Sequence, residues 1–241
     1  MKRIIAIQSF RGGTGKSHVI ANLAYLLHLE HKKVAVLDAN LAAPNLHLLF
    51  DVNPERLEYT LNDYLAHNCE AKDILLDING QGKLFLIPST LSAAATTQIA
   101  REGCNLERLC EAIRQIAIEF DYLLIDTQSG LGAETLLSLS MANILLILQE
   151  PHHLDDPGTA IAREMAKKFA VESCYSVINK AMPAMDIAAL HTQSIDAVLP
   201  FSDKISAPSN QGLFGIFAQL FPKDPLTEAL RHLAKKIARP R

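Results

Sequence analysis

The stretch SFRGGTGKSH at residues 9–18 constrains the fold of this chain more than any other part of its sequence. It follows residues 3–8, RIIAIQ, a short apolar run that is rich in β-branched residues. The apolar residues that follow it recur at helical spacing: Val19, Leu23, Leu26 and Leu27. A strand, a glycine-rich turn and a helix form the context that a phosphate-binding loop requires. Gly15-Lys16-Ser17 matches the GK[ST] end of a Walker A loop, although Phe10 occupies the place of that pattern's first glycine.

The residue types of this loop predict that it binds a polyphosphate. Glycines let the backbone curl so that successive N–H groups point inward, and a helix N-terminus adds the positive end of its dipole. The predicted binding residues run through the whole loop: Gly12, Gly13, Thr14, Gly15, Lys16 and Ser17. In such a loop the lysine reaches the outer phosphates, and the serine hydroxyl is a ligand of a bridging Mg²⁺. The competing interpretation is a glycine-rich turn with a surface lysine.

Apolar runs along the chain predict the strands of one sheet: residues 3–8, 32–38, 83–89, 121–127, 143–150, 173–180 and 194–201. Helical patterns lie between several of these runs, at residues 106–120, 133–139 and 158–169. Strands that are apolar throughout and alternate with helices predict a doubly wound α/β fold, with a single, mostly parallel sheet and helices on both faces. Because the sequence has no internal repeat and no linker rich in Pro, Gly or Ser, we expect residues 1–241 to form one nucleotide-binding domain.

Three polar residues lie at the carboxyl ends of predicted strands, where ligands bind in such a sheet: Asp38, Asp126 and Asn179. Asp126 ends an apolar strand as a Walker B aspartate does, and we predict that Ser17, Asp38 and Asp126 hold the metal. Asp at a strand end also occurs for capping or turn reasons, and Asn is common in strand-end turns. The pairing of Asp126 with the loop upstream favours the functional interpretation.

These motifs, in this order, resemble the deviant Walker A ATPases of the ParA and MinD family. RGGTGKS is similar to their KGGxGK[ST] loop, LDANLAAPNL to their switch I segment and DYLLIDTQSG to their Walker B and switch II segment. VINK is similar to the strand whose asparagine, here Asn179, contacts adenine, and residues 199–212 resemble a late loop that covers the base and ribose. The resemblance implies a switch that binds Mg-ATP, sandwiches two nucleotides in a face-to-face homodimer and comes apart after hydrolysis.

Three residues depart from the pattern of that family. Arg11 stands where the family carries a lysine that reaches the partner subunit's phosphates, and the resemblance carries this role to Arg11; the alternative is an exposed arginine at a loop edge. Asn40 stands where an aspartate positions or activates the attacking water. Because an amide cannot accept a proton, we expect hydrolysis that is slow or supported from elsewhere. His18 replaces a small hydroxyl residue that helps to bind the α-phosphate; its imidazole either donates to that phosphate or points away.

The C-terminal segment predicts a basic amphipathic helix at about 224–238. Asp-Pro at its start is a helix-entry signal, and leucine and isoleucine recur on one face: Leu226, Leu230, Leu233 and Ile237. Basic residues gather in the same segment: Arg231, Lys235, Lys236, Arg239 and Arg241. The favoured interpretation is a last helix that packs on the domain. A surface for non-specific DNA comes second. A membrane helix as in MinD comes third, because the apolar face lacks Phe and Trp.

We therefore expect an ATPase that positions or partitions a cargo, such as a plasmid, chromosome or protein complex, on the nucleoid, together with a stimulating partner or cargo adaptor. The alternatives are an ATP-binding regulator with little hydrolysis and a membrane-associated cell-division regulator. The net charge of −3 gives no global reason for DNA binding. The cysteines, Cys69, Cys104, Cys110 and Cys174, lack the spacing of metal ligands, which disfavours an iron–sulfur carrier. With no signal peptide before the first strand, we expect a cytoplasmic protein.

Overall fold

A computed structural model describes residues 2–90, 97, 101, 103–154, 156–182, 195–206 and 215–239. Its centre is a sheet with the strand order β3-β4-β2-β5-β1-β6-β7-β8. The strands are β1 (Arg3–Gln8), β2 (Val34–Ala39), β3 (Leu76–Asp77), β4 (Leu84–Ile87), β5 (Tyr122–Thr127), β6 (Ile144–Gln149), β7 (Ser173–Ala181) and β8 (Ala197–Pro200). Every neighbouring pair is parallel except β3 and β4. The prediction of one mostly parallel sheet is confirmed.

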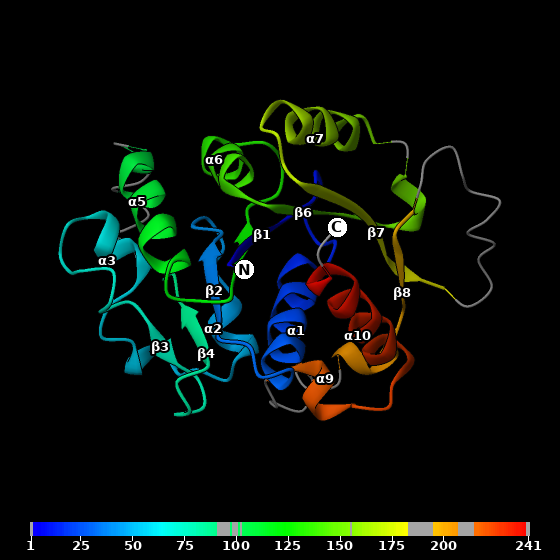
Figure 1. Ribbon diagram of the computed structural model, residues 1–241, viewed down its shortest axis with the longest axis horizontal. Helices are drawn as coiled ribbons and strands as arrows, with labels where there is room; N and C mark the ends of the chain where they lie inside the picture. Colours follow the sequence, from blue (N-terminus) through cyan, green and yellow to red (C-terminus); the bar gives the residue numbers. More distant parts are fainter. Residues whose placement is uncertain are drawn as a thin grey trace.

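Helices cover both faces of the sheet (Figure 1). The α-helices are α1 (Lys16–Leu29), α2 (Leu46–Leu49), α3 (Leu61–Leu65), α5 (Leu106–Ala117), α6 (Ala133–Met141), α7 (Pro157–Lys168), α9 (Phe217–Leu220) and α10 (Pro225–Ala238). Short 3-10 helices cover Pro54–Arg56, Pro151–His153 and Asp203–Ser206. Figure 1 shows α5, α6 and α7 along one face, and α1, α9 and α10 along the other. Each of the seven predicted strands is present, whereas β3 and the short helices α2, α3 and α9 were not predicted.

The pleat of the strands divides the core into layers on the two faces of the sheet. In β2, Val34 and Val36 pack in the cluster formed with α1 and α10, whereas Ala35 and Leu37 pack in the cluster formed with α3 and α5. A third cluster joins α6 and α7 to β1 and β6. Because both faces are covered, the central strands are buried along their whole length, which is why their sequences are apolar throughout.

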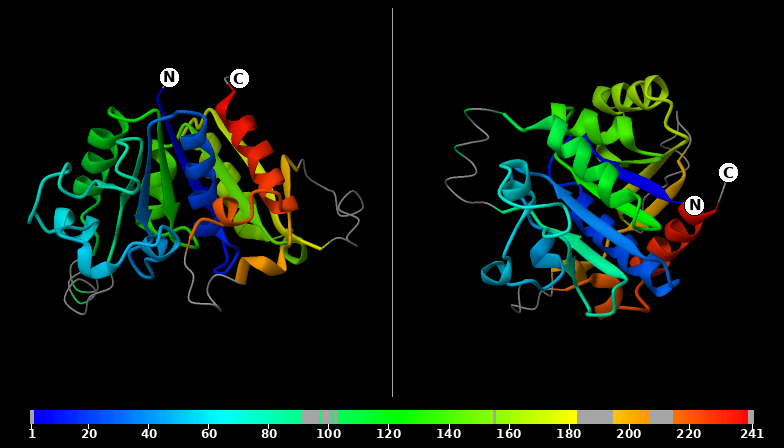
Figure 2. Two further views of the ribbon diagram at one scale, coloured as in Figure 1. Left: turned by 90° about the horizontal axis from the view of Figure 1, so that it is seen from below. Right: turned by 60° about the vertical axis from the view of Figure 1, so that its left-hand side comes forward.

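The C-terminal helix α10 packs beside α1 (Figure 2). Its apolar residues are all buried in the core: Leu226, Leu230, Leu233 and Ile237. The side chain of Arg3 donates to the carbonyls of Ile237 (2.9 Å) and Arg239 (3.2 Å), so the start of the chain holds the end of this helix. The structure therefore agrees with the packing interpretation, and this apolar face is not free to enter a membrane. No helix within the described ranges is long and apolar enough to cross a membrane.

Candidate nucleotide-binding site

The loop between β1 and α1 has a backbone that only glycine adopts readily. Gly13 and Gly15 have φ values of 77° and 91°, in the left-handed region that side chains disfavour. Gly15 also lies against Asn179, since a Cβ at this position would be 2.6 Å from the Asn179 Nδ2. Gly15 is the N-cap of α1, and no described side chain caps this helix. The loop therefore presents its backbone N–H groups and the start of α1 as an anion site.

Lys16, in the first turn of α1, is the buried cation of the site. Its Nζ donates to the hydroxyls of Ser9 (2.9 Å) and Ser129 (2.6 Å), which come from the ends of β1 and β5. Burial lowers the pKa of Lys16, and the nearby Asp126 opposes that shift. The ammonium is thus held at the mouth of the loop by two neutral hydroxyls. Phosphate oxygens carry negative charge, so they would compete well for these hydrogen bonds.

Asp38 and Asp126 lie side by side at the carboxyl edge of the sheet, because β2 and β5 pair in a register that sets them opposite each other. Both side chains are fully buried. Burial raises the pKa of both carboxyl groups. At Asp38 the nearby charge of Asp126 raises the pKa further. At Asp126 the hydrogen bond from Ser17 and the charge of Lys16 oppose the shift. Two buried carboxyl groups on paired residues of neighbouring strands favour a cation beside them.

The residues at Asp126 fit a Mg²⁺ ion. The Ser17 hydroxyl donates to Asp126 Oδ2 at 2.5 Å, whereas Oδ1 of the same carboxyl is buried without a hydrogen-bond partner among the described residues. Carboxylate and hydroxyl oxygens are suitable magnesium ligands, and this ion binds through one or two carboxylates together with phosphates and water. Within the described ranges no group of three or more His, Cys, Asp or Glu side chains could hold a metal, so a Mg²⁺ here would depend on phosphate oxygens as well.

Asp38 anchors the loop that follows β2. Its Oδ1 accepts a hydrogen bond from the backbone N–H of Asn40 (3.2 Å), and its Oδ2 accepts from those of Asn45 and Leu46 (both 3.1 Å). The bonds therefore hold the two ends of this loop together at the carboxyl end of β2. Both oxygens of Asp38 already accept hydrogen bonds from the backbone. Its predicted role as a metal ligand stays a prediction.

A cavity of about 470 Å³ lies between the two loops and the end of β5. The phosphate-binding loop and His18 line one side; the other lining residues are Asn40, Ala42, Ala43, Asn45, Gln128 and Ser129. The Asn40 side chain donates through Nδ2 to the carbonyl of Ala43 (3.0 Å). Burial and the nearby Lys180 lower the pKa of His18, so a neutral imidazole faces the cavity. This volume is within the usual range for a small-molecule site.

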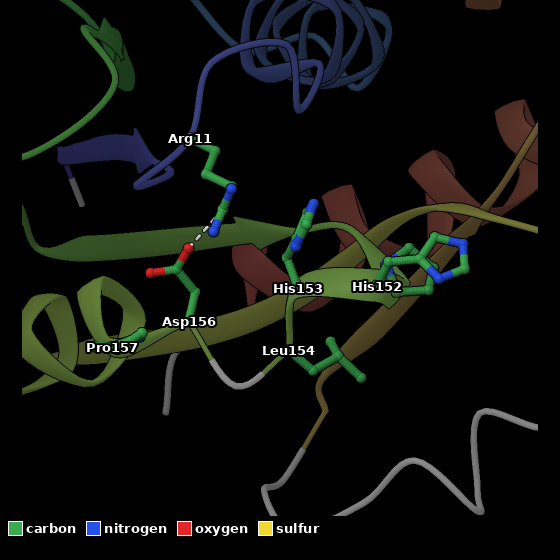
Figure 3. A pocket seen from close by; sticks show the side chains of 7 residues that line it. Arg11, His152, His153, Leu154, Asp156 and Pro157 are labelled. Carbon is green, nitrogen blue, oxygen red and sulfur yellow. Dashed lines mark hydrogen bonds and ion pairs between the residues drawn. The ribbon is translucent and has the colours of Figure 1, made fainter.

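Arg11 lies outside this cavity and pairs within its own chain. Its Nε donates to Asp156 Oδ2 at 2.8 Å, and Asp156 Oδ1 accepts from the backbone N–H of Gly158, so this aspartate also caps α7 (Figure 3). The ion pair borders a second cavity of about 290 Å³ that His152 and His153 also line. The side chain of Arg11 is still 57% exposed. Its predicted contact with a second subunit stays a prediction.

Phe10, which occupies the position of the missing first glycine, packs on α7. A Cβ added to Gly158 would lie 2.0 Å from the Phe10 ring, so the aromatic side chain rests directly on the helix backbone. Phe10 and Arg11 together tie the phosphate-binding loop to the first turn of α7. This contact between distant segments gives Phe10 a physical role that the motif alone did not reveal.

Asn179, at the end of β7, contacts the phosphate-binding loop itself. Its Nδ2 donates to the carbonyl of Thr14 at 2.8 Å. The predicted contact with adenine stays a prediction. Lys180 also reaches the loop. It is the last residue of VINK, and the sequence pattern did not predict a role for it. The late loop at 199–212 lies only partly within the described residues, up to 206, and Arg241 lies outside them.

Comparisons with known proteins agree with this geometry. A family model described as "AAA domain" matches residues 2–178. An uncharacterized ATP-binding protein of Methanocaldococcus jannaschii is 30% identical over 241 residues, covering 97% of this chain and 86% of its own. The septum site-determining protein MinD of Synechocystis is 28% identical over 224 residues, and the match covers 88% of this chain and 81% of the MinD chain. The structure of MinD complexed with Mg-ADP from Pyrococcus horikoshii has a TM-score of 0.83 at 22% identity, covering 99% and 97% of the two chains.

The glycine backbone predicts a graded response to alanine. Gly12→Ala should change stability least, because the nearest atom to its Cβ is 3.9 Å away and its φ is outside the left-handed region. In Gly13→Ala the new Cβ meets no atom within 4 Å. The free energy of unfolding should still fall by about 1–2 kcal/mol, because the backbone is left-handed at this position. Gly15→Ala adds the clash with Asn179 and should lose more. Urea unfolding of the ligand-free variants measures this order; equal losses at Gly12 and Gly15 would contradict the described loop.

Proposed function

The chain belongs to the ParA/MinD family of P-loop ATPases, and we propose that it is an ATP-dependent dimerising switch that positions or partitions a cellular cargo. The observation that carries the proposal is the convergence of Lys16, Ser17 and Asp126 at one edge of the sheet, with a buried carboxylate oxygen left without a partner. A glycine-rich loop whose backbone N–H groups lie beside one buried lysine suits a polyphosphate better than any neutral ligand. The similarity to a septum site-determining protein supports the positioning role.

In this proposal each side chain has a defined task toward ATP. The loop N–H groups and Lys16 bind the phosphates, and Ser17 and Asp126 would hold Mg²⁺. When bound, that ion would neutralise charge that develops on the phosphates during transfer. Asn40 lines the cavity and its amide is tied to Ala43, so it can orient a water molecule for attack on the terminal phosphate but cannot take its proton.

The homodimer is the first part of the proposal to test. Two subunits would face each other across the nucleotide edge, and Arg11 would exchange Asp156 for the phosphates of the partner subunit. With Mg-ATP the wild-type chain should elute at twice the monomer mass in size exclusion with light scattering, and with Mg-ADP as a monomer. Arg11→Ala should bind ATP and remain monomeric. A wild-type chain that stays monomeric with Mg-ATP, although ATP is bound, would contradict the switch.

A second candidate function, favoured by Asn40, is an ATP-binding regulator with little hydrolysis. General base assistance contributes about 10²–10⁴-fold to a rate, and an amide lacks it. We therefore expect Asn40→Asp to raise ATP turnover by at least about 10-fold, with an affinity for ATP no higher than that of the wild-type chain, because the added negative charge lines the same cavity as the phosphates. Phosphate release over time measures this. Fast turnover by the wild-type chain, with no gain in the variant, would exclude the regulator.

We propose that the dimer acts in the cytoplasm on a nucleoid surface, with a partner protein that stimulates the cycle. Several basic residues of the C-terminal segment are already engaged: Arg231 pairs with Glu228, and Lys236 pairs with Asp196. Lys235 and Arg239 are exposed and are the described cations of this segment most open to phosphates. The buried apolar face of α10 disfavours the membrane-associated alternative.

The DNA surface has its own test. Binding to random-sequence duplex DNA with Mg-ATP should weaken as salt rises, because bound cations are released. Replacing both Lys235 and Arg239 with alanine should weaken binding and lower the slope of log K against log salt by up to about 2 per subunit. Lys168→Ala, which removes an exposed lysine of α7, serves as the control. An unchanged slope in the double variant would place the DNA surface elsewhere or exclude it.

A further inference from the structure

The end of β7 departs from regular strand geometry beside the phosphate-binding loop. β7 and β8 pair at Ile178–Val198 and at Ala181–Pro200, so β7 has one residue more than β8 between these pairs. This is a β-bulge, and it contains Asn179 and Lys180. Consecutive strand residues normally point to opposite faces of a sheet, and a bulge changes this alternation. Here both side chains reach the same loop.

Lys180 is held in an unfavourable backbone conformation at this bulge. Its φ is 60°, in the left-handed region where glycine or asparagine would be less strained. An observed outlier of this kind next to a functional loop points to a role for the side chain. The side chain spans from β7 to the loop: its Nζ donates to the carbonyl of Gly13 at 2.6 Å and pairs with Glu150 at 2.5 Å.

Asn179 and Lys180 bind two successive carbonyls of the phosphate-binding loop. Lys180 binds that of Gly13, and Asn179 binds that of Thr14 at 2.8 Å. In a trans peptide the C=O and the following N–H point in opposite directions. Fixing these two carbonyls toward β7 therefore turns the N–H groups of Thr14 and Gly15 away from it. These are amides that the loop offers to phosphates, and both residues line the cavity of the site.

We infer that Lys180 is a positioning residue, which acts with Asn179 as a clamp that fixes the amides of the phosphate-binding loop before the nucleotide arrives. This inference rests on the proposed binding of ATP by that loop. Glu150, at the end of β6, holds the ammonium in place from the other side. The Lys180 side chain is 43% exposed, and so open an ion pair adds little to global stability. Its contribution is therefore to the conformation of the loop.

The clamp can be separated from a merely structural role by four variants of the full chain. Lys180→Met keeps the length and the backbone strain but removes the donor. Lys180→Gly removes the donor and relieves the strain. Lys180→Arg keeps a positive donor, and Lys168→Met is a matched control, since Lys168 is an exposed lysine of α7 that pairs with Glu164. Equilibrium dissociation constants for Mg-ATP, Mg-ADP and Mg-GTP are measured for each, together with melting temperatures.

We expect Lys180→Met and Lys180→Gly to weaken Mg-ATP and Mg-ADP alike, by about 10-fold, which corresponds to about 1.4 kcal/mol. Lys180→Arg should recover most of the affinity. Lys168→Met should bind as wild type. The melting temperatures of Lys180→Met, Lys180→Arg and Lys168→Met should stay close to that of the wild-type chain, and Lys180→Gly should melt no lower, because it relieves the strained backbone. The preference for ATP over GTP should not change in any variant, because the clamp acts on the phosphate side of the nucleotide.

Several results would overturn the inference. If Lys180→Gly bound nucleotide as tightly as wild type, the side-chain donor of Lys180 would not be needed, and only the backbone at this position would matter. A loss with ATP but not with ADP would mean direct contact with the terminal phosphate, and a loss with ATP but not with GTP would mean contact with the base. Wild-type affinity in Lys180→Met would exclude any role. If the wild-type chain and Lys168→Met bound neither Mg-ATP nor Mg-ADP, the proposed function would fail and this inference with it.

Discussion

The carboxylate of Asp126, buried at the end of β5 with a hydrogen bond from Ser17 and the charge of Lys16 nearby, is the group around which the site is arranged. Charged groups in a sheet interior are costly unless they are paired and hydrogen-bonded. Here one oxygen accepts from Ser17 and the other has no partner among the described residues, while Asp38 lies beside it in the neighbouring strand. The apolar layers on both faces of the sheet hold these groups in place. A folded chain with an incomplete charge balance at one edge favours a ligand that completes it.

The two loops at this edge differ in how firmly the rest of the chain holds them. The phosphate-binding loop is fixed at its back by Asn179 and Lys180 from β7, and at its side by Phe10 and Arg11 against α7. Within the part of the chain that the structure describes, the side chain of Asp38 is what ties the loop after β2 to the sheet, through its bonds to Asn40, Asn45 and Leu46. The tip of this loop, with Asn40 and Ala43, borders the open cavity. In the proposed function this arrangement would give the phosphates rigid support and place a less supported segment beside the attacking water, as a nucleotide switch requires.

The sequence predicts the parts of this structure that depend on local patterns. Apolar runs and helical periodicity are properties of neighbouring residues, so the seven main strands and α1, α5, α6, α7 and α10 are predictable. So is the meeting of the loop with Asp38, Asp126 and Asn179, because parallel strands place their carboxyl ends at one edge. The contacts of Arg11 with Asp156, Phe10 with Gly158 and Lys180 with Gly13 are not predictable in this way. Each joins segments far apart in sequence through one side chain, and Lys180 reaches the loop only because of a one-residue bulge.

The most direct test of the account is to identify the nucleotide that the chain retains. The protein is incubated with Mg-ATP, desalted rapidly and denatured, and the released nucleotide is identified by chromatography, with Lys16→Ala as the control. The account predicts that the wild-type chain retains nucleotide and the variant does not: ATP if Asn40 limits hydrolysis, ADP with released phosphate if water is activated despite the amide. A wild-type chain that retains no more nucleotide than Lys16→Ala would contradict it.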